Sequence, residues 1–248
     1  RGSGTDSGEH VYLGTNVKSD FGDVRFTGTD NTQYSYWIES SDSTSAVIWV
    51  KIPSLPAAGT QVYIYWGNSG ATSASSGADT FPFFDDFSGT FLHTSKWTNN
   101  GATVSVSNGI ATISSTSSAY VGIQSNSGTY SAARFRVKTS DSSGKYQYAG
   151  LSTRLSGGSD QCILVDNGGN NHEFWTMNSG GYKLSSMGSA DSSYHVYDTV
   201  RVNTTNVYGS RDGSITSHAQ NVPVSTMPVA LYNWVGTIQS DWILSRPV

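Results

Sequence analysis

FFDDFSGTFLHTSKW, residues 83–97, is the stretch that decides how this chain folds. It opens with three phenylalanines around an Asp-Asp pair, a pattern typical of a strand that is largely buried and ends in a turn. The preceding segment, GNSGATSASSGAD (67–79), is poor in apolar residues and contributes little to a core. We therefore predict a linker there, a first domain over residues 1–79 and a second over residues 80–248.

The composition of the chain excludes several classes of function. Its 248 residues are enough for one large or two smaller domains with buried cores. The net charge of −4 and the dispersed Lys and Arg residues provide no basic surface for nucleic acid. No apolar run approaches the roughly 20 residues that a membrane-spanning helix needs, and residues 1–20 do not form a signal peptide. We expect neither a nucleic-acid partner nor a membrane span.

Strand-like segments follow one another along the sequence, and no segment has a convincing helical pattern. Asn, Asp and Gly residues separate these segments, which is typical of all-β sandwiches. Asn108-Gly109 and Asp212-Gly213 each predict a tight hairpin. The expected strand segments are AVIWVKI (46–52), QVYIYW (61–66), TVSVSNGIATIS (103–114), AARFRVKTS (132–140), QYAGLSTR (147–154), HVYDTVRVN (195–203) and VALYNW (229–234).

The single cysteine, Cys162, excludes an internal disulfide framework. It lies in the apolar run QCILVD, so we predict a small buried core residue rather than a reactive thiol. A chain without disulfides fits a cytosolic protein or a prokaryotic surface protein, and it does not fit a small secreted animal domain.

Several uncommon aromatic blocks occur in order in the first part of the chain. They are Asp20 to Phe26, Tyr36-Trp37-Ile38-Glu39, Val47 to Lys51 and Tyr63 to Asn68. With these blocks, residues 9 to about 87 resemble the domain of unknown function 2341 family. The resemblance implies an extracellular or cell-surface location, because such domains recur in large prokaryotic surface and secreted proteins.

The same resemblance implies a second module, a concanavalin A-like or laminin G-like jelly roll. Asp85-Asp86-Phe87, Ser95-Lys96-Trp97 and the closing Asp241-Trp242-Ile243 are the elements that match it. The expected fold class is therefore all-β, with a small β-sandwich-like module followed by a jelly-roll β-sandwich. Such a fold implies architecture but not chemistry.

Members of the first family usually begin with extra strands, whereas this chain begins inside the matching region. Either the chain starts at a boundary or cleavage point, or another chain supplies the missing strand. An open sheet edge that accepts a strand from an identical subunit would allow assembly by strand exchange.

An enzyme remains an alternative. A glycosidase needs two carboxylates about 5–10 Å apart, and the three glutamates, Glu9, Glu39 and Glu173, are widely separated in the sequence. A polysaccharide lyase fits better, because it uses His, Tyr and Arg to bind a uronate and abstract its proton. Residues of these types are His172, Tyr146, Tyr148, Tyr182, Arg134 and Arg136. In the competing interpretation, His172 is an exposed turn residue and the tyrosines are half-buried.

Two sets of residues bear on metal binding. The five histidines are isolated in the sequence, which argues against a transition-metal cluster. The jelly rolls that the second module resembles often hold a structural Ca²⁺ where the first and last strands meet, which implies Asp85, Asp86 and Asp241 as ligands. The alternative is that these aspartates bond loop amides or face solvent.

Glycan binding requires a flat aromatic ring flanked by amides and carboxylates. Trp175, Tyr182, Asn171 and Trp234 provide this combination and are the candidate contact residues, although a core role for Trp175 stays open. The remaining tryptophans lie in apolar runs and are expected in the core: Trp37, Trp49, Trp66, Trp97 and Trp242. Asn203-Thr204-Thr205 is a glycosylation sequon.

The leading function is therefore a non-catalytic glycan-binding, lectin-like or adhesive module of a bacterial or archaeal surface protein. The second is a structural surface or filament subunit that assembles by strand exchange with identical subunits. A polysaccharide-active enzyme, lyase more than hydrolase, is the third.

Overall fold

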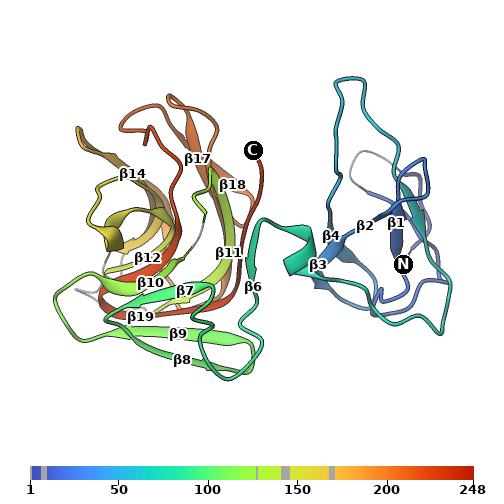
Figure 1. Cartoon of the computed structure of the whole chain (residues 1–248), viewed down its shortest axis with the longest axis horizontal. Helices are drawn as coiled ribbons and strands as arrows, with labels where there is room; N and C mark the ends of the chain where they lie inside the picture. The colour runs from blue at the N-terminus through green and yellow to red at the C-terminus, as the bar shows by residue number, and fades with distance from the viewer. Residues whose placement is uncertain (1, 7–9, 127, 141–145, 168–170) are drawn as a thin grey trace. The chain divides into compact units, whose positions relative to one another are not determined.

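The computed structural model describes residues 2–6, 10–126, 128–140, 146–167 and 171–248 (Figure 1). Its regular secondary structure is almost entirely β-strand, as the sequence predicted. The chain divides into two compact units, residues 1–82 and 83–248. Among the described residues, no helix has both the length and the apolar character to cross a membrane.

The first unit contains two small antiparallel sheets. One has the strand order β2-β1-β5, and the other pairs β3 with β4. The strands are β1 (Arg25–Thr27), β2 (Gln33–Tyr34), β3 (Tyr36–Ser41), β4 (Ala46–Val50) and β5 (Tyr63–Tyr65). The core of this unit is formed by Leu13, Val17, Phe21, Val24, Phe26 and Tyr36.

The Ser-rich segment at 67–79 packs within the first unit instead of forming a free linker. The hydroxyl of Ser75 accepts the backbone N–H of Ile38 at 2.9 Å, and the Tyr36 hydroxyl accepts that of Ala74 at 3.2 Å. Ser76 caps a one-turn helix, α1 (Gly77–Thr80). The linker prediction was wrong because hydroxyl side chains can hold a segment in place through hydrogen bonds to backbone groups. Such a segment packs without contributing much apolar area, so its composition resembles that of a linker.

The second unit is a sandwich of two antiparallel sheets, which we call the front sheet and the back sheet. The front sheet has the order β15-β14-β13-β12-β19-β10-β7. Its strands are β7 (Trp97–Asn100), β10 (Val121–Ser125), β12 (Tyr146–Ser152), β13 (Gln161–Asn167), β14 (Asn171–Asn178), β15 (Gly181–Ser189) and the first part of β19 (Val229–Ser245). A short 3-10 helix, η1 (Arg154–Ser156), follows β12.

The back sheet is built around the second part of β19. One side of β19 pairs with β11 and continues to β16, β17 and β18, while its other side pairs with β9 and β6, and β8 pairs with β9. The strands are β6 (Phe83–Asp85), β8 (Thr103–Ser107), β9 (Ile110–Ser115), β11 (Ala132–Thr139), β16 (His195–Arg201), β17 (Val207–Arg211) and β18 (Ser214–His218).

Strand β19 belongs to both sheets, and Gly236 marks the change. Residues 229–235 pair with β12 of the front sheet, whereas residues 236–240 pair with β9 of the back sheet. Gly236 has a φ of 119°, and a Cβ atom there would lie 2.9 Å from Nε2 of Gln147. Only glycine meets both conditions without strain.

Gly236→Ala is expected to lower the free energy of unfolding by about 2 kcal/mol or more, because backbone strain and a steric clash add together. Gly213→Ala is the matched control: its φ is also positive, at 85°, but nothing lies within 4 Å of the added Cβ. Urea unfolding of both variants measures the difference. Equal losses of unfolding free energy in the two variants would show that the steric clash with Gln147 does not destabilise the fold.

The core between the two sheets is apolar and includes Cys162, which is fully buried as predicted. Trp37, Trp97 and Trp242 are also buried, in agreement with the sequence analysis. Trp66 is not, since 40% of it is exposed. The prediction failed there because Ile64 of β5 faces the core of the first unit, whereas Tyr65 and Trp66 remain at the surface.

Both predicted hairpins are present. Asn108 and Gly109 have φ values of 53° and 74° between β8 and β9, and Asp212 and Gly213 have values of 48° and 85° between β17 and β18. These are the positive angles that a type I′ turn requires.

The first strand of the second unit pairs with the last, as its resemblance to jelly rolls implied. Asp85 lies opposite Ile243.

Candidate functional site: an aromatic face on the front sheet

Successive side chains of the front sheet point alternately into the core and away from it. Ala149 and Leu151 lie in the core, whereas Tyr148 and Tyr232 belong to a separate apolar cluster on the opposite side. We call this opposite side the front face. Its aromatic side chains are Tyr120, Tyr146, Tyr148, Trp175, Tyr182, Tyr232 and Trp234.

Trp175 is fixed in place by hydrogen bonding and stacking. Its indole N–H donates to Oε2 of Glu173 at 2.7 Å, and Nδ2 of Asn167 donates to Oε1 of the same carboxylate at 2.6 Å. The Trp175 ring stacks on Tyr182, with centroids 5.7 Å apart and planes 19° apart. Since Tyr182 is 59% exposed, the two rings form a rigid platform that solvent can reach.

The centre of the front face is a buried aromatic floor. Tyr148 and Tyr232 stack with centroids 4.6 Å apart, and Tyr120 contacts both rings edge-on. The guanidinium of Arg154 lies 4.2 Å from the Tyr120 ring centroid, a cation–π contact. Burial raises the pKa of Tyr148 and of Tyr232 above the usual value, so both hydroxyls stay protonated.

The structure brings some of the predicted glycan-contact residues together and separates another. Trp175 and Tyr182 stack, and Asn171 lies on the same side of β14 as Trp175. Trp234 is on β19, three strands away, which corresponds to about 14 Å across the sheet. It packs edge-on against Tyr120 instead, with the two ring centroids 4.9 Å apart.

Residues proposed for a lyase lie on different faces. Tyr146, Tyr148 and Tyr182 are on the front face, but His172 is buried between the sheets. Arg134 and Arg136 are on β11 of the back sheet, paired with Asp198 and Asp241 respectively. The alternation of β14 explains the separation of His172, because neighbouring residues of a strand point to opposite sides. The expectation that His172 is an exposed turn residue was also wrong.

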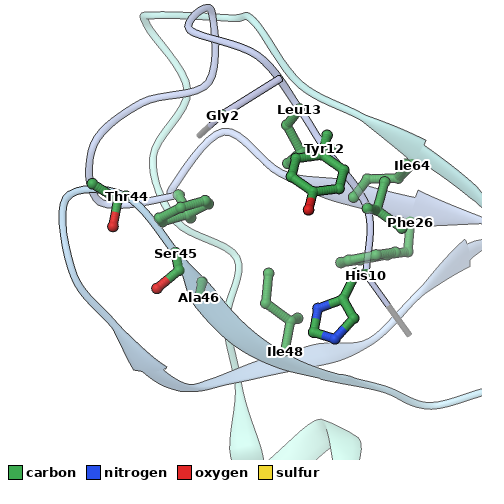
Figure 2. A pocket seen from close by; sticks show the side chains of 12 residues that line it. Gly2, His10, Tyr12, Leu13, Phe26, Thr44, Ser45, Ala46, Ile48 and Ile64 are labelled. Carbon is green, nitrogen blue, oxygen red and sulfur yellow. The ribbon is translucent and has the colours of Figure 1, made fainter. Parts of the chain in front are cut away.

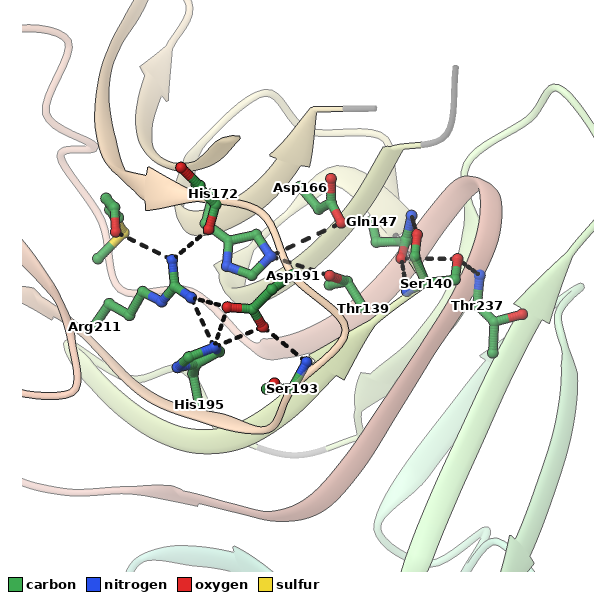
Figure 3. Close-up of polar contacts among 12 residues, drawn as sticks. Thr139, Ser140, Gln147, Asp166, His172, Asp191, Ser193, His195, Arg211 and Thr237 are labelled. Atoms are coloured by element: carbon green, nitrogen blue, oxygen red, sulfur yellow. Dashed lines mark hydrogen bonds and ion pairs between the residues drawn. The ribbon is translucent and has the colours of Figure 1, made fainter. Parts of the chain in front are cut away.

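His172 belongs to a buried polar cluster (Figure 3). Its Nδ1 lies 2.6 Å from the Tyr197 hydroxyl, and its Nε2 lies 3.1 Å from Oγ1 of Thr139. Burial lowers the pKa of His172 to about 4, with further lowering by Arg211 and His195. His172 is therefore neutral near pH 7, and it lies away from the front face.

His195 connects this cluster to two carboxylates. Its Nε2 is 2.9 Å from Oδ1 of Asp191, its Nδ1 is 2.5 Å from Oδ2 of Asp212, and Arg211 lies 2.9 Å from Asp191. The hydrogen bond with His195 is the largest cause that holds the pKa of Asp191 well below its usual range. These contacts join β16 to β17 and to the segment before β16, so they act as structural bonds.

The three aspartates considered as calcium ligands have separate protein partners. Asp85 is buried and accepts the Trp97 indole N–H at 2.6 Å, with the Lys96 ammonium at 3.5 Å. Asp86 is exposed and accepts the backbone N–H of Ser88, while Asp241 pairs with Arg136. Within the described part of the chain, no group of three or more His, Cys, Asp or Glu side chains is arranged to hold a metal ion.

Glu39 and Glu173 lie in different units of the chain. Glu173 lies on the front face, and Glu39 accepts the indole N–H of Trp49 in the first unit. Glu9 lies outside the described residues.

Asn203, in the predicted sequon, lies in an exposed turn. Its side chain accepts the backbone N–H groups of Thr205 and Asn206 at 2.8 Å.

The first unit contains a cavity of about 580 Å³ between its two sheets. Figure 2 shows Phe26, Ile48, Ile64 and the ring of Tyr12 around it. Its lining includes Leu13, Phe21 and Phe26, so the cavity reaches the core of the unit.

Residues 20–100 match the family model described as a domain of unknown function (DUF2341). The family resemblance predicted for residues 9–87 is thus confirmed with different limits. The DUF2341 match includes the whole of β6 and β7, so it continues past Pro82 into the second unit. No curated protein sequence matches the chain.

Solved structures similar to this chain are sandwich enzymes. A Bacillus licheniformis β-glucanase is 16% identical with a TM-score of 0.54, over 67% of this chain and 98% of that chain. A β-1,3-1,4-glucanase (lichenase) from a mouse hindgut metagenome is 17% identical with a TM-score of 0.55, over 67% and 99%. The matched 67% of this chain equals the share of the chain that the second unit, residues 83–248, makes up. The likeness confirms the jelly-roll fold.

Sequence reasoning missed several residues of the front face. Tyr120 and Tyr232 were not proposed, because their contact depends on pairing between β10 and β19, which are over 100 residues apart. Glu173 was noted only as an isolated glutamate. Its position two residues before Trp175 was the available signal, since residues i and i+2 of a strand share a face.

Proposed function

We propose that the second unit binds glycans through the front face, as a non-catalytic module that acts at the outside of the cell. The observation that carries the proposal is the Trp175–Tyr182 platform, which the Glu173 carboxylate holds in position. Flat rings of this kind cover the apolar side of a sugar, and the amides of Asn167 and Asn171 offer hydrogen bonds to its hydroxyls. The jelly-roll fold supports the proposal, since the similar structures are named as glucanases.

The carboxylates of the front sheet support binding rather than hydrolysis. Glycoside hydrolysis by the common mechanisms uses two carboxyl groups on either side of the scissile bond. Among the described strand residues of this sheet, only Asp166 and Glu173 carry carboxylates, and Asp166 lies beside His172 between the sheets. Glu173 is buried and accepts two hydrogen bonds, so it is placed to orient Trp175.

Trp175→Ala is the test of this proposal. We expect at least about a tenfold loss of affinity for the glycans that the wild-type chain binds on an array, because a central stacking ring is removed. Trp66→Ala is the matched control, since Trp66 is an exposed tryptophan of the first unit. Thermal unfolding of both variants checks that the fold is kept. Unchanged glycan affinity in a folded Trp175→Ala protein would contradict the proposal.

Assembly by strand exchange is the second candidate function, and the cavity of the first unit favours it. The cavity exposes the apolar core between two small sheets, and β2 and β5 each pair with β1 on one side only within the described residues. An extended segment of another copy placed there would cover apolar side chains and pair with a free edge.

Val11→Lys tests the assembly proposal, because Val11 is an exposed residue that lines this cavity. We expect the wild-type chain to form oligomers as its concentration rises and the variant to dissociate at higher concentrations. Val224→Lys, at an exposed position of the second unit, is the control. Sedimentation velocity measures all three, and wild-type monomers at every concentration would exclude assembly.

A further inference from the structure

We infer that the front face selects uncharged glycans and that Glu173 excludes anionic sugars such as uronates. The inference rests on the glycan-binding function proposed above and names the class of ligand. Its basis is the distribution of charge on the front sheet. The Asp, Glu, Lys and Arg residues in the described strands of this sheet, taking β19 up to Val235, are Asp166, Glu173 and Lys183.

Of these three residues, Glu173 is the one on the front face. Asp166 lies 3.9 Å from Nε2 of His172, and both side chains are buried between the sheets. Lys183 alternates with Tyr182 and Leu184 along β15, so it points to the opposite side of the sheet from the platform. The Glu173 carboxylate therefore sets the charge beside the stacking rings.

The negative charge of Glu173 lies where it would act most strongly on a bound sugar. Its Oε2 is 2.7 Å from the indole nitrogen of Trp175, at the edge of the ring on which a sugar would stack. Glu173 is only 7% exposed, so water and salt screen its charge less than that of a surface carboxylate. A uronate stacked on Trp175 would bring a second negative charge close to it, whereas a neutral sugar would not.

Basic residues are held elsewhere. Arg154 packs on the Tyr120 ring, towards the aromatic floor rather than the Trp175–Tyr182 platform. Arg134 and Arg136 lie on the back sheet and pair with aspartates there. The platform thus combines hydroxyl-bonding amides with a single buried anion, which matches a neutral polyhydroxy ligand.

Binding of neutral and acidic polysaccharides to the full chain tests the inference, with mannan and laminarin as neutral probes and polygalacturonate and alginate as acidic ones. We expect the wild type to bind a neutral probe at least about tenfold more tightly than either acidic one. Glu173→Gln keeps one oxygen acceptor for the indole N–H and should tighten acidic binding about tenfold, with neutral binding changed by less than threefold. Glu39→Gln is the matched control, since Glu39 also accepts a tryptophan N–H.

Two results would overturn the charge selection. One is equal wild-type affinity for neutral and acidic probes, with both reduced in Trp175→Ala; glycan binding would then stand without selection by charge. The other is a folded Glu173→Gln protein whose acidic binding is unchanged. If Glu173→Gln fails to fold, raising NaCl from about 0.05 to 1 M should narrow the wild-type preference, and a constant preference would contradict the inference. Failure of the glycan-binding function itself would appear differently, as probe binding that is unchanged in Trp175→Ala.

Discussion

Asp85→Ala is expected to destabilise the second unit by about 3 kcal/mol, because it removes the acceptor of a buried indole N–H. The Asp85 carboxylate accepts the N–H of the fully buried Trp97 at 2.6 Å and the backbone N–H of Phe87 at 3.1 Å. It also lies 3.5 Å from the Lys96 ammonium. All three partners would lose this carboxylate at once.

Asp86→Ala is the matched control for this prediction. Asp86 is the neighbouring aspartate, but it is exposed and accepts the backbone N–H of Ser88. Its replacement should cost less than about 1 kcal/mol. Asp85→Asn, which keeps an oxygen acceptor for the indole, should fall between the two. Urea unfolding measures the three variants, and an Asp85→Ala loss no larger than that of Asp86→Ala would contradict a structural role for the buried carboxylate.

Stability is expected to fall by up to about 3 kcal/mol as the pH is lowered from 6.5 to 4, because His172 is held neutral in the fold. Its folded-state pKa is lowered from 6.5 to about 4 by burial and by Arg211 and His195. Between these values the unfolded chain binds a proton that the folded chain does not, so protonation favours unfolding. Above pH 6.5 the contribution is constant. Burial also lowers the pKa of His218, which acts in the same direction.

His172→Asn separates this contribution from that of other groups. The amide can still bond Tyr197 or Thr139 but does not titrate. We expect a smaller change in unfolding free energy between pH 6.5 and 4.5 than in the wild type, measured by urea unfolding at each pH. The pKa of Asp191 is lowered, so its contribution to stability is lost only as the pH falls below the ordinary aspartate value of 3.8. That lies outside the pH range from 6.5 to 4.5. An unchanged pH dependence in His172→Asn would rule out His172 as its source.

Local sequence signals determined the class of fold and several of its turns. Asn108-Gly109 and Asp212-Gly213 fix their hairpins because the positive φ angles depend on those residues alone. Cys162 was predicted in the core from the apolar run around it. Trp66 lies in a similar run, but it follows the end of β5 at Tyr65 and is 40% exposed.

The candidate site depended on sequence and tertiary structure to different degrees. Trp175 and Tyr182 could be proposed together because β14 and β15 are joined by a short Gly-rich turn. Trp234 was grouped with them, yet it lies on β19 against Tyr120. Strand alternation predicts which residues share a face of one strand. It does not predict which strands are neighbours, since that is fixed by pairings over long stretches of chain.

By itself, the sequence determined an all-β chain, a new strand-forming segment at Phe83, and the residue types that we propose for glycan contact. Only the tertiary structure decided that His172 is buried between the sheets while Glu173, its neighbour, lies beside the Trp175 platform. It also decided that the aspartates of the opening stretch act separately, with Asp85 bonded to Trp97. The physical reason is the same in both cases: a side chain's partner is chosen by the packing of two sheets against one core, and β19, which belongs to both sheets, brings their strands together.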